Sequence, residues 1–170
     1  MSNVPSVPVD GFVRTDIVTT IATITAPKAA TEISAGSSKH ISCYITAGGF
    51  TLAPSQGSIS DDRECDQFTA QQPGRVTIDN ATITVIDNTG TALDATANDA
   101  VVALTPGATV YVVRRYGILF STAPAAAQKV DVWKCVVGKK QRIAPEANSV
   151  FRSVFPLFVQ DYAQDVATAA

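Results

Sequence analysis

The sequence predicts a mainly β domain, a sandwich or barrel with one short helix on its flank and an extended arm at each end. Three observations lead to this fold class. Several stretches rich in Val, Ile, Thr and aromatic residues alternate with Gly- and Pro-containing turns. Only one segment has apolar residues at helical spacing. The chain has 170 residues, of which 46% are hydrophobic and 16% charged, and this suits one domain with a buried core.

The N-terminal part predicts an arm, a strand and a long loop. Residues 1–12 contain two prolines and no apolar periodicity, so we expect an extended arm outside the core. The alternation in HISCYIT, residues 40–46, predicts a half-buried strand that turns Ile41, Cys43 and Ile45 inward. The segment 48–74 is predicted to be a loop, and loops of this length usually have a function or a partner.

The middle of the chain predicts a bent strand followed by the helix. Residues 75–87 are rich in β-forming side chains, but the apolar positions change parity, so we expect a bulge or bend near Asp79–Asn80. Apolar residues then recur at helical spacing over 92–104. Thr91 and Asp94 are typical of a capping box at the start of this helix, and a Pro-Gly pair follows its end.

Three further strands are predicted before the C-terminal end. Residues 109–118 are apolar at both parities, which indicates that both faces are covered. Residues 129–137 contain the single Trp and lead into a basic turn. In the strand 149–159, Pro156 favours an edge position or a bulge. Residues 161–170 show no core pattern and are expected to form a second arm.

No metal site is predicted. One His and three Cys could in principle form a Cys3His zinc set, but His40 and Cys43 would point to opposite faces of one strand. The cysteines are instead expected to be reduced, buried thiols. The acidic run SDDRECDQ lacks the ligand spacing and the central glycine of a calcium-binding EF-hand loop.

No catalytic set or cofactor site is predicted either. A chain with one His and no G-x-S-x-G motif has few ways to activate a nucleophile, and no glycine cluster forms a phosphate loop. The adjacent Asp61 and Asp62 diverge on an extended backbone, which disfavours paired-carboxylate chemistry. We therefore expect a protein that is not an enzyme.

Charge and hydropathy limit the partners. A net charge of −2 and a pI of about 5.2 disfavour nucleic-acid binding. The pair Arg114–Arg115 and the basic turn 139–142 are expected to be solvated or to pair with carboxylates. No apolar run approaches the ~20 residues that span a bilayer, and no targeting signal is visible, so we expect no membrane insertion and folding in a cytoplasm.

Four stretches carry a family resemblance: ISCYITAGGF (41–50), ISDDRECDQFTAQQPGR (59–75), LTPGATVYVVRRYG (104–117) and VDVWKCVVGKKQRIAPEANSVFR (130–152). With them, and with the LFVQD string near the end, the chain resembles the major tail tube proteins of long-tailed, non-contractile phages, particularly those of actinobacterial phages. The strings DDR-x-C…QPG and PEANSV are the most specific parts of this resemblance.

The resemblance implies a β-sandwich that forms hexameric rings, which stack into a hollow tail tube. The tube would surround the tape measure protein, end at tail terminator and tail-tip proteins, and pass DNA without binding it specifically. Such a protein is made in the cytoplasm of the host bacterium and resides in the virion tail. The alternatives are a contractile-tail or secretion-system tube, a capsid decoration module and a carbohydrate-binding domain.

Two sets of functional residues are predicted. We expect the acidic run to be an assembly contact, with Cys65 turned inward and the basic turn as its partner; the candidate residues are Asp61, Asp62, Arg63, Glu64, Asp66, Lys139, Lys140 and Arg142. One ion pair of Arg63 with an acid of the run is expected. A weakly electronegative channel lining is expected from the polar positions of the bent strand: Thr77, Asp79, Thr82, Thr84 and Asp87.

Overall fold

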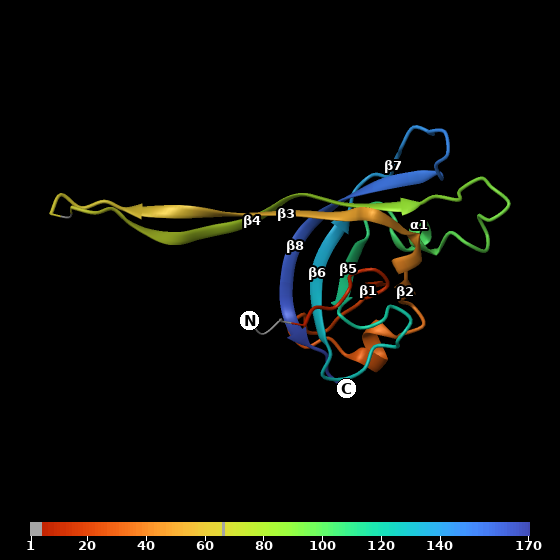
Figure 1. The fold of residues 1–170 in the computed structure, drawn as a ribbon, viewed down its shortest axis with the longest axis horizontal. Helices are drawn as coiled ribbons and strands as arrows, with labels where there is room; N and C mark the ends of the chain where they lie inside the picture. The colour runs from red at the N-terminus through yellow and green to blue at the C-terminus, as the bar shows by residue number, and fades with distance from the viewer. Residues whose placement is uncertain (1–4, 66) are drawn as a thin grey trace.

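The computed structural model describes residues 5–65 and 67–170, which form one curved antiparallel sheet (Figure 1). Its strands lie in the order β2-β1-β5-β6-β8-β4-β3, and β7 pairs with β8. The strands are β1 (Val13–Val18), β2 (Lys39–His40), β3 (Ile45–Asp61), β4 (Ala70–Ile86), β5 (Thr109–Tyr116), β6 (Lys129–Val137), β7 (Gln141–Arg142) and β8 (Arg152–Ala167). The mainly β fold class is confirmed.

The core lies on both faces of the central strands. On one face, side chains from β5, β6 and β8, such as Val112, Trp133 and Phe155, pack against Ile83 of β4 and Leu104 after the helix. On the other face, Val113 and Val132 pack against the segment that follows β1, where a π-helical turn spans Ala29–Ile33. The prediction that both faces of β5 are covered is therefore confirmed.

Two details of the predicted strands are also resolved. β4 bends where the sequence changes parity: Asn80 has a φ of 54°, and the register with β3 shifts between Thr51 and Ala53. The edge position predicted for Pro156 is wrong, because β8 has neighbours on both sides in this stretch. Pro156 lies opposite Thr82 in the last pair of the β4–β8 ladder, so its missing N–H falls where that ladder ends.

The loop predicted over 48–74 is wrong. This segment forms most of a long hairpin of β3 and β4, which projects well beyond the rest of the molecule (Figure 1). Before Ala81, β4 pairs only with β3, and it joins β8 from Thr82 onward. Cross-strand hydroxyl contacts join Thr51 to Thr82 at 2.7 Å and Ser55 to Thr77 at 2.8 Å. Because the projecting part buries neither face, it lacks the apolar alternation by which a strand is recognised.

The helix is shorter than predicted. α1 spans only Asp99–Ala103, whereas residues 88–98 form turns, and Leu93 is 54% exposed. The side chains of this segment bind its own backbone: Asn98 accepts the Asn88 N–H, and Asp94 accepts the Gly90 N–H. Such local hydrogen bonds compete with helix formation.

Two predictions at the ends of the sheet are wrong. In place of a continuous strand over residues 40–46, β2 ends at His40 and a 3₁₀ turn (Ser42–Tyr44) precedes β3, so Cys43 is exposed although Ile41 is buried. Residues 161–167, expected in an arm, continue β8 and pair with β6, where Tyr162 lies opposite Trp133 and Ala163 lies opposite Val132. Alternation is weak there because one edge and one face of the strand remain open.

Candidate assembly surfaces

The acidic run forms the tip of the projecting hairpin, between the end of β3 and the start of β4. The expected ion pair is present: Arg63 Nη2 lies 3.0 Å from Asp61 Oδ2. The inward position expected for Cys65 is wrong, since this residue is exposed. Asp66 lies outside the described residues. The distal hairpin also exposes Phe68 (82%) and Ile59 (57%), which adds apolar surface to the acidic tip.

The basic turn predicted to receive the tip is partly neutralised within its own subunit. Asp87, at the end of β4, lies 3.1 Å from Lys140 Nζ and 3.7 Å from Arg142 Nε. It also accepts hydrogen bonds from the Ser153 hydroxyl and the Thr89 N–H. Burial alone would raise the pKa of Asp87, but these hydrogen bonds and Lys140 outweigh it and hold the pKa well below its usual range.

A hollow of about 350 Å³ adjoins this ion-pair cluster. Arg142 and Arg152 supply positive charge to its wall, and Ile143 and Phe151 supply apolar surface. The Phe151 side chain is 63% exposed. Lys139 is also exposed nearby. We call this surface, made by Lys139, Arg142, Ile143, Phe151 and Arg152, the basic end.

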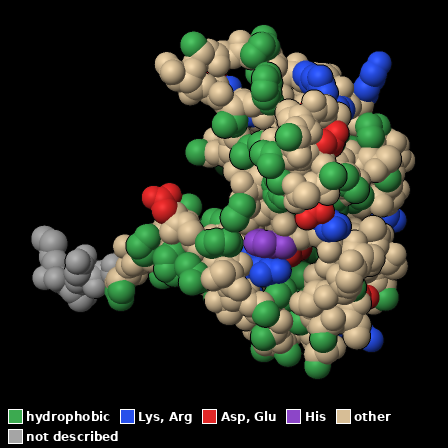
Figure 2. Space-filling model, turned by 90° about the vertical axis from the view of Figure 1, so that its right-hand side faces the viewer, with side chains coloured by type: hydrophobic (Ala, Val, Ile, Leu, Met, Phe, Trp, Pro, Cys, Tyr) green, Lys and Arg blue, Asp and Glu red, His purple; other side chains and the backbone are tan. Residues whose placement is uncertain are grey.

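The tip and the basic end lie at opposite ends of the molecule. In Figure 1 the hairpin tip is at the far left, whereas β7 and the neighbouring loops are at the upper right. Figure 2, viewed from that right-hand side, shows Lys and Arg side chains standing at the top of the face. An acidic, partly apolar projection and a basic, partly apolar hollow therefore point in roughly opposite directions.

The predicted channel-lining residues do not form one set. Thr77 and Asp79 precede the bend at Asn80, whereas Thr82 and Thr84 follow it on the half-exposed face of β4. The assignment of Asp87 to this lining is wrong. After the bend, odd-numbered residues point into the core with Ile83 and Val85, and Asp87 is only 4% exposed.

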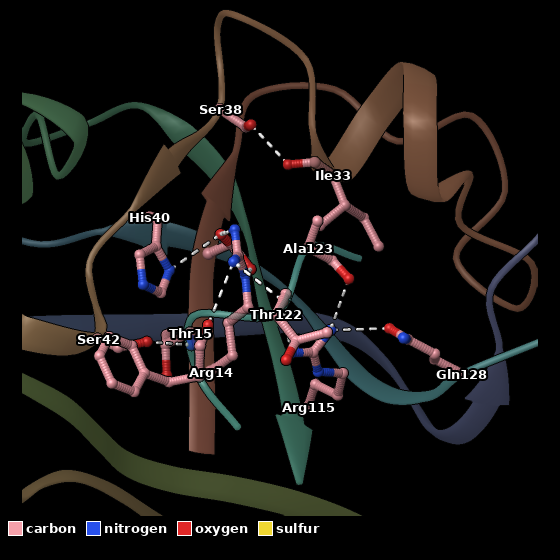
Figure 3. Close-up of polar contacts among 12 residues, drawn as sticks. Arg14, Thr15, Ile33, Ser38, His40, Ser42, Arg115, Thr122, Ala123 and Gln128 are labelled. Atoms are coloured by element: carbon pink, nitrogen blue, oxygen red, sulfur yellow. Dashed lines mark hydrogen bonds and ion pairs between the residues drawn. The ribbon is translucent and has the colours of Figure 1, made fainter. Parts of the chain in front are cut away.

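A second cluster, in which two arginines hold one loop, was not predicted (Figure 3). Arg115, expected to be solvated or paired with a carboxylate, is 2% exposed and donates to the carbonyls of Leu119 at 3.0 Å and Thr122 at 2.8 Å. Arg14 pairs with Asp16 at 2.8 Å and donates to the Phe120 carbonyl at 3.2 Å. An arginine inside an apolar strand was the available signal. The cluster is structural, because its donors are used by the loop.

Open strand edges flank the hairpin. From Leu157 onward β8 pairs with β6 on one side, and among the described residues no strand covers its other side. β4 before Ala81 likewise pairs only with β3. The two edges diverge around a groove of about 710 Å³ between residues 78–82 and 156–159. Unpaired edges of this length are sites at which another chain adds strands to a sheet.

Metal binding and membrane spanning were checked over the described residues. Within residues 5–65 and 67–170 there is no group of three or more His, Cys, Asp or Glu side chains that could hold a metal ion. Over the same part of the chain, no helix is long and apolar enough to cross a membrane.

The fold of this chain is similar to that of a chain in a solved structure. A chain in the cryo-EM structure of the anti-feeding prophage baseplate, sixfold symmetrised, matches 95% of this chain over 96% of its own length, with a TM-score of 0.55 and 11% identity. The family model described as phage tail tube protein matches residues 1–170, so the chain belongs to the phage tail tube protein family. This is a family of structural proteins and not of enzymes, as predicted. No curated protein matches the sequence significantly.

Proposed function

We propose that the protein polymerises as stacked hexameric rings into the hollow tail tube of a long-tailed, non-contractile phage. In this proposal the tube assembles around the tape measure protein in the host cytoplasm, joins tail terminator and tail-tip proteins at its ends, and conducts genomic DNA during ejection. Family membership supports the tube. The sixfold symmetrised assembly that contains a chain of the same fold supports the ring number.

The observation that carries the proposal is the placement of complementary surfaces at opposite ends of one subunit. The acidic tip of one copy fits the basic end of the next, since Asp62 and Glu64 have no cation within ion-pair distance among the described residues. Contacts between different surfaces of identical subunits generate open polymers when the rotation does not close. A tip that contacts the next ring therefore extends a tube.

The channel side of the proposal rests on what β4 exposes. Thr77, Thr82 and Thr84 are uncharged, and Asp79 adds a negative charge that repels phosphate. A wall of this composition lacks the cations that release counterions from DNA, so the genome passes without being held. The open edges of β8 and β4 offer the means of joining the sheets of neighbouring subunits in a ring.

Charge reversal tests the contact between rings. Asp61→Lys with Asp62→Lys should prevent long tubes from forming, as seen by negative-stain electron microscopy, because the tip would then repel the basic end. Lys139→Glu in the same chain should partly restore them. Lys140 and Arg142 are left unchanged because both lie within ion-pair distance of Asp87.

The matched control is Lys28→Glu, which reverses an exposed charge away from both surfaces and should leave tube formation unchanged. Tubes of normal length from the Asp61→Lys, Asp62→Lys variant would contradict the contact. A contractile-tail or secretion-system tube is the second candidate, favoured by the likeness to the anti-feeding prophage chain. A sheath around the tube in micrographs of the particle would decide for it.

A further inference from the structure

Arg114, in β5, is a half-buried arginine without an acceptor. Among the described residues its side chain makes no hydrogen bond and no ion pair. Its Nε is buried without a partner, as are those of Arg115 and Arg152, but its two Nη nitrogens, which reach solvent, have no acceptor either. The other buried or half-buried arginines all have acceptors: Arg14 has Asp16, Arg115 has loop carbonyls and Arg152 has Glu146. Arg114 is thus the exception among them.

Two aromatic rings fix the Arg114 guanidinium in place. Its Cζ lies 4.4 Å from the centroid of Phe50 and 5.3 Å from that of Tyr116. Burial lowers the pKa of Arg114, although an arginine stays charged in any accessible pH range. Ring faces attract the cation but leave its N–H donors unused, and a buried charge without a hydrogen-bonded partner destabilises a fold.

Arg114 lines a hollow of about 260 Å³. Its walls come from the start of β1, the first residues of β3 and the N-terminal segment, including Val13, Ile45, Gly48 and Asp10. The hollow is large enough for a carboxylate side chain. Asp131 lies opposite Arg114 in the sheet register, but its Oδ1 accepts the Asp165 N–H at 2.8 Å.

The site suits a single carboxylate and not a nucleic-acid backbone. Arg114 is the one cation among the residues that line the hollow, and Asp10 adds a negative charge to the wall. A run of phosphates would require several cations in a row. A guanidinium presents a planar pair of donors that matches one carboxylate.

We propose that Arg114 binds a hairpin carboxylate of a second copy of this chain in the assembled tube. This inference rests on the proposed function. The hairpin is the element that extends beyond its own subunit (Figure 1), and it carries exposed acids with no cation in ion-pair range, Asp62, Glu64 and Asp79. The acceptor that Arg114 lacks in one subunit is thus supplied by assembly.

Arg114→Met separates this role from a structural one. Replacing an unpartnered buried charge with an apolar side chain of similar length should leave the Tm of the unassembled subunit unchanged or higher. The concentration needed for tube formation should rise about tenfold, the equivalent of one charged hydrogen bond lost per contact. Arg115→Met is the matched control, because it removes the donors of the loop carbonyls of Leu119 and Thr122 and should therefore lower the Tm. A lowered Tm with normal assembly for Arg114→Met would overturn the proposal.

Carbodiimide cross-linking identifies the partner. Arg114→Lys keeps the charge and introduces an amine, which the reagent couples to a carboxylate in direct contact. In tubes made from mixed isotope-labelled and unlabelled subunits, mass spectrometry should find this amine joined to an acid of residues 51–79 in another copy. Coupling to Asp10 or Asp131 of the same copy would overturn the proposal. Tubes that still form after Asp61→Lys with Asp62→Lys would contradict the tip contact alone, so the two failures are distinguishable.

Discussion

Asp87 ties the basic turn that follows β6 to the end of β4, 3.1 Å from Lys140 Nζ and 3.7 Å from Arg142 Nε. The parity change near Asn80 is visible in the sequence, and the bend is present. Carried through that bend, the odd positions Ile83, Val85 and Asp87 fall on one buried face. A carboxylate on an apolar face needs cations, and the basic turn that follows β6 supplies them. The ion-pair cluster was therefore predictable, whereas the acceptors of Arg115 come from a loop without any pattern.

Asp87→Asn should lower the free energy of unfolding by about 3 kcal/mol at pH 7, because it leaves Lys140 without its buried counter-charge. The pKa of Asp87 is lowered in the folded state, so the stabilisation is complete at neutral pH. It is lost as the pH falls below about 4, the ordinary carboxyl value. Denaturation of both proteins between pH 7 and pH 3 should show the difference shrinking.

Asp99→Asn is the matched control for that experiment. Its carboxylate pairs with Lys39 at 2.9 Å, but both side chains are more than a third exposed, 49% and 41%. An exposed pair of this kind contributes about 0–1 kcal/mol. If both variants lost the same free energy of unfolding at pH 7, the buried Asp87 cluster would stabilise the fold no more than an exposed ion pair does.

At the scale of elements, a strand could be predicted from the sequence where at least one of its faces is buried within the subunit. β6 was predicted over the same residues that it occupies, and β5 nearly so, because both are covered within one subunit. The hairpin was taken for a loop because its distal side chains are buried by nothing in the subunit. The helix was overestimated because hydrogen bonds of Asn98 and Asp94 hold turns that apolar spacing does not reveal.

Shortening the hairpin should separate folding from assembly. Gln56 and Val76 face each other in the register, so an Asn-Gly turn can join them in place of residues 57–75. The Phe50, Leu52 and Ile78 side chains that reach the core remain. We expect a Tm within a few degrees of the wild type and no tubes in electron micrographs. Tubes from this variant would show that the distal hairpin is dispensable.

At the scale of the whole molecule, the first described residues pack little against the fold. Residues 5–11 are exposed. The carbonyls of Gly11 and Phe12 accept the Phe120 and Gly117 N–H groups, and the Phe12 N–H closes a local turn onto the Val9 carbonyl. The expectation of an arm over residues 1–12 thus remains a prediction. The tail at 161–170 could not be assigned correctly, because its partner strand β6 was not known to lie beside it.

Deletion of residues 1–10 should leave thermal unfolding unchanged, since both carbonyl contacts are retained. If the segment orders against a neighbouring copy, its backbone pairing and apolar side chains Val7 and Val9 stabilise the polymer. We therefore expect shorter tubes, measured as a length distribution by electron microscopy. A distribution equal to that of the full chain would mean that the segment has no part in growth.

The projecting hairpin also has a consequence for when the protein polymerises. An isolated two-stranded ribbon in water is marginally stable, and fixing each residue costs roughly 1–2 kcal/mol of conformational entropy. When two free subunits associate, they form one contact, and this contact alone must offset the entropy cost. A subunit that binds to a complete ring forms contacts with several neighbours at the same time. Growth from a preformed template is then fast and spontaneous initiation is slow. The hairpin would act as a nucleation barrier, which keeps a concentrated pool of subunits unpolymerised until a starting ring is present.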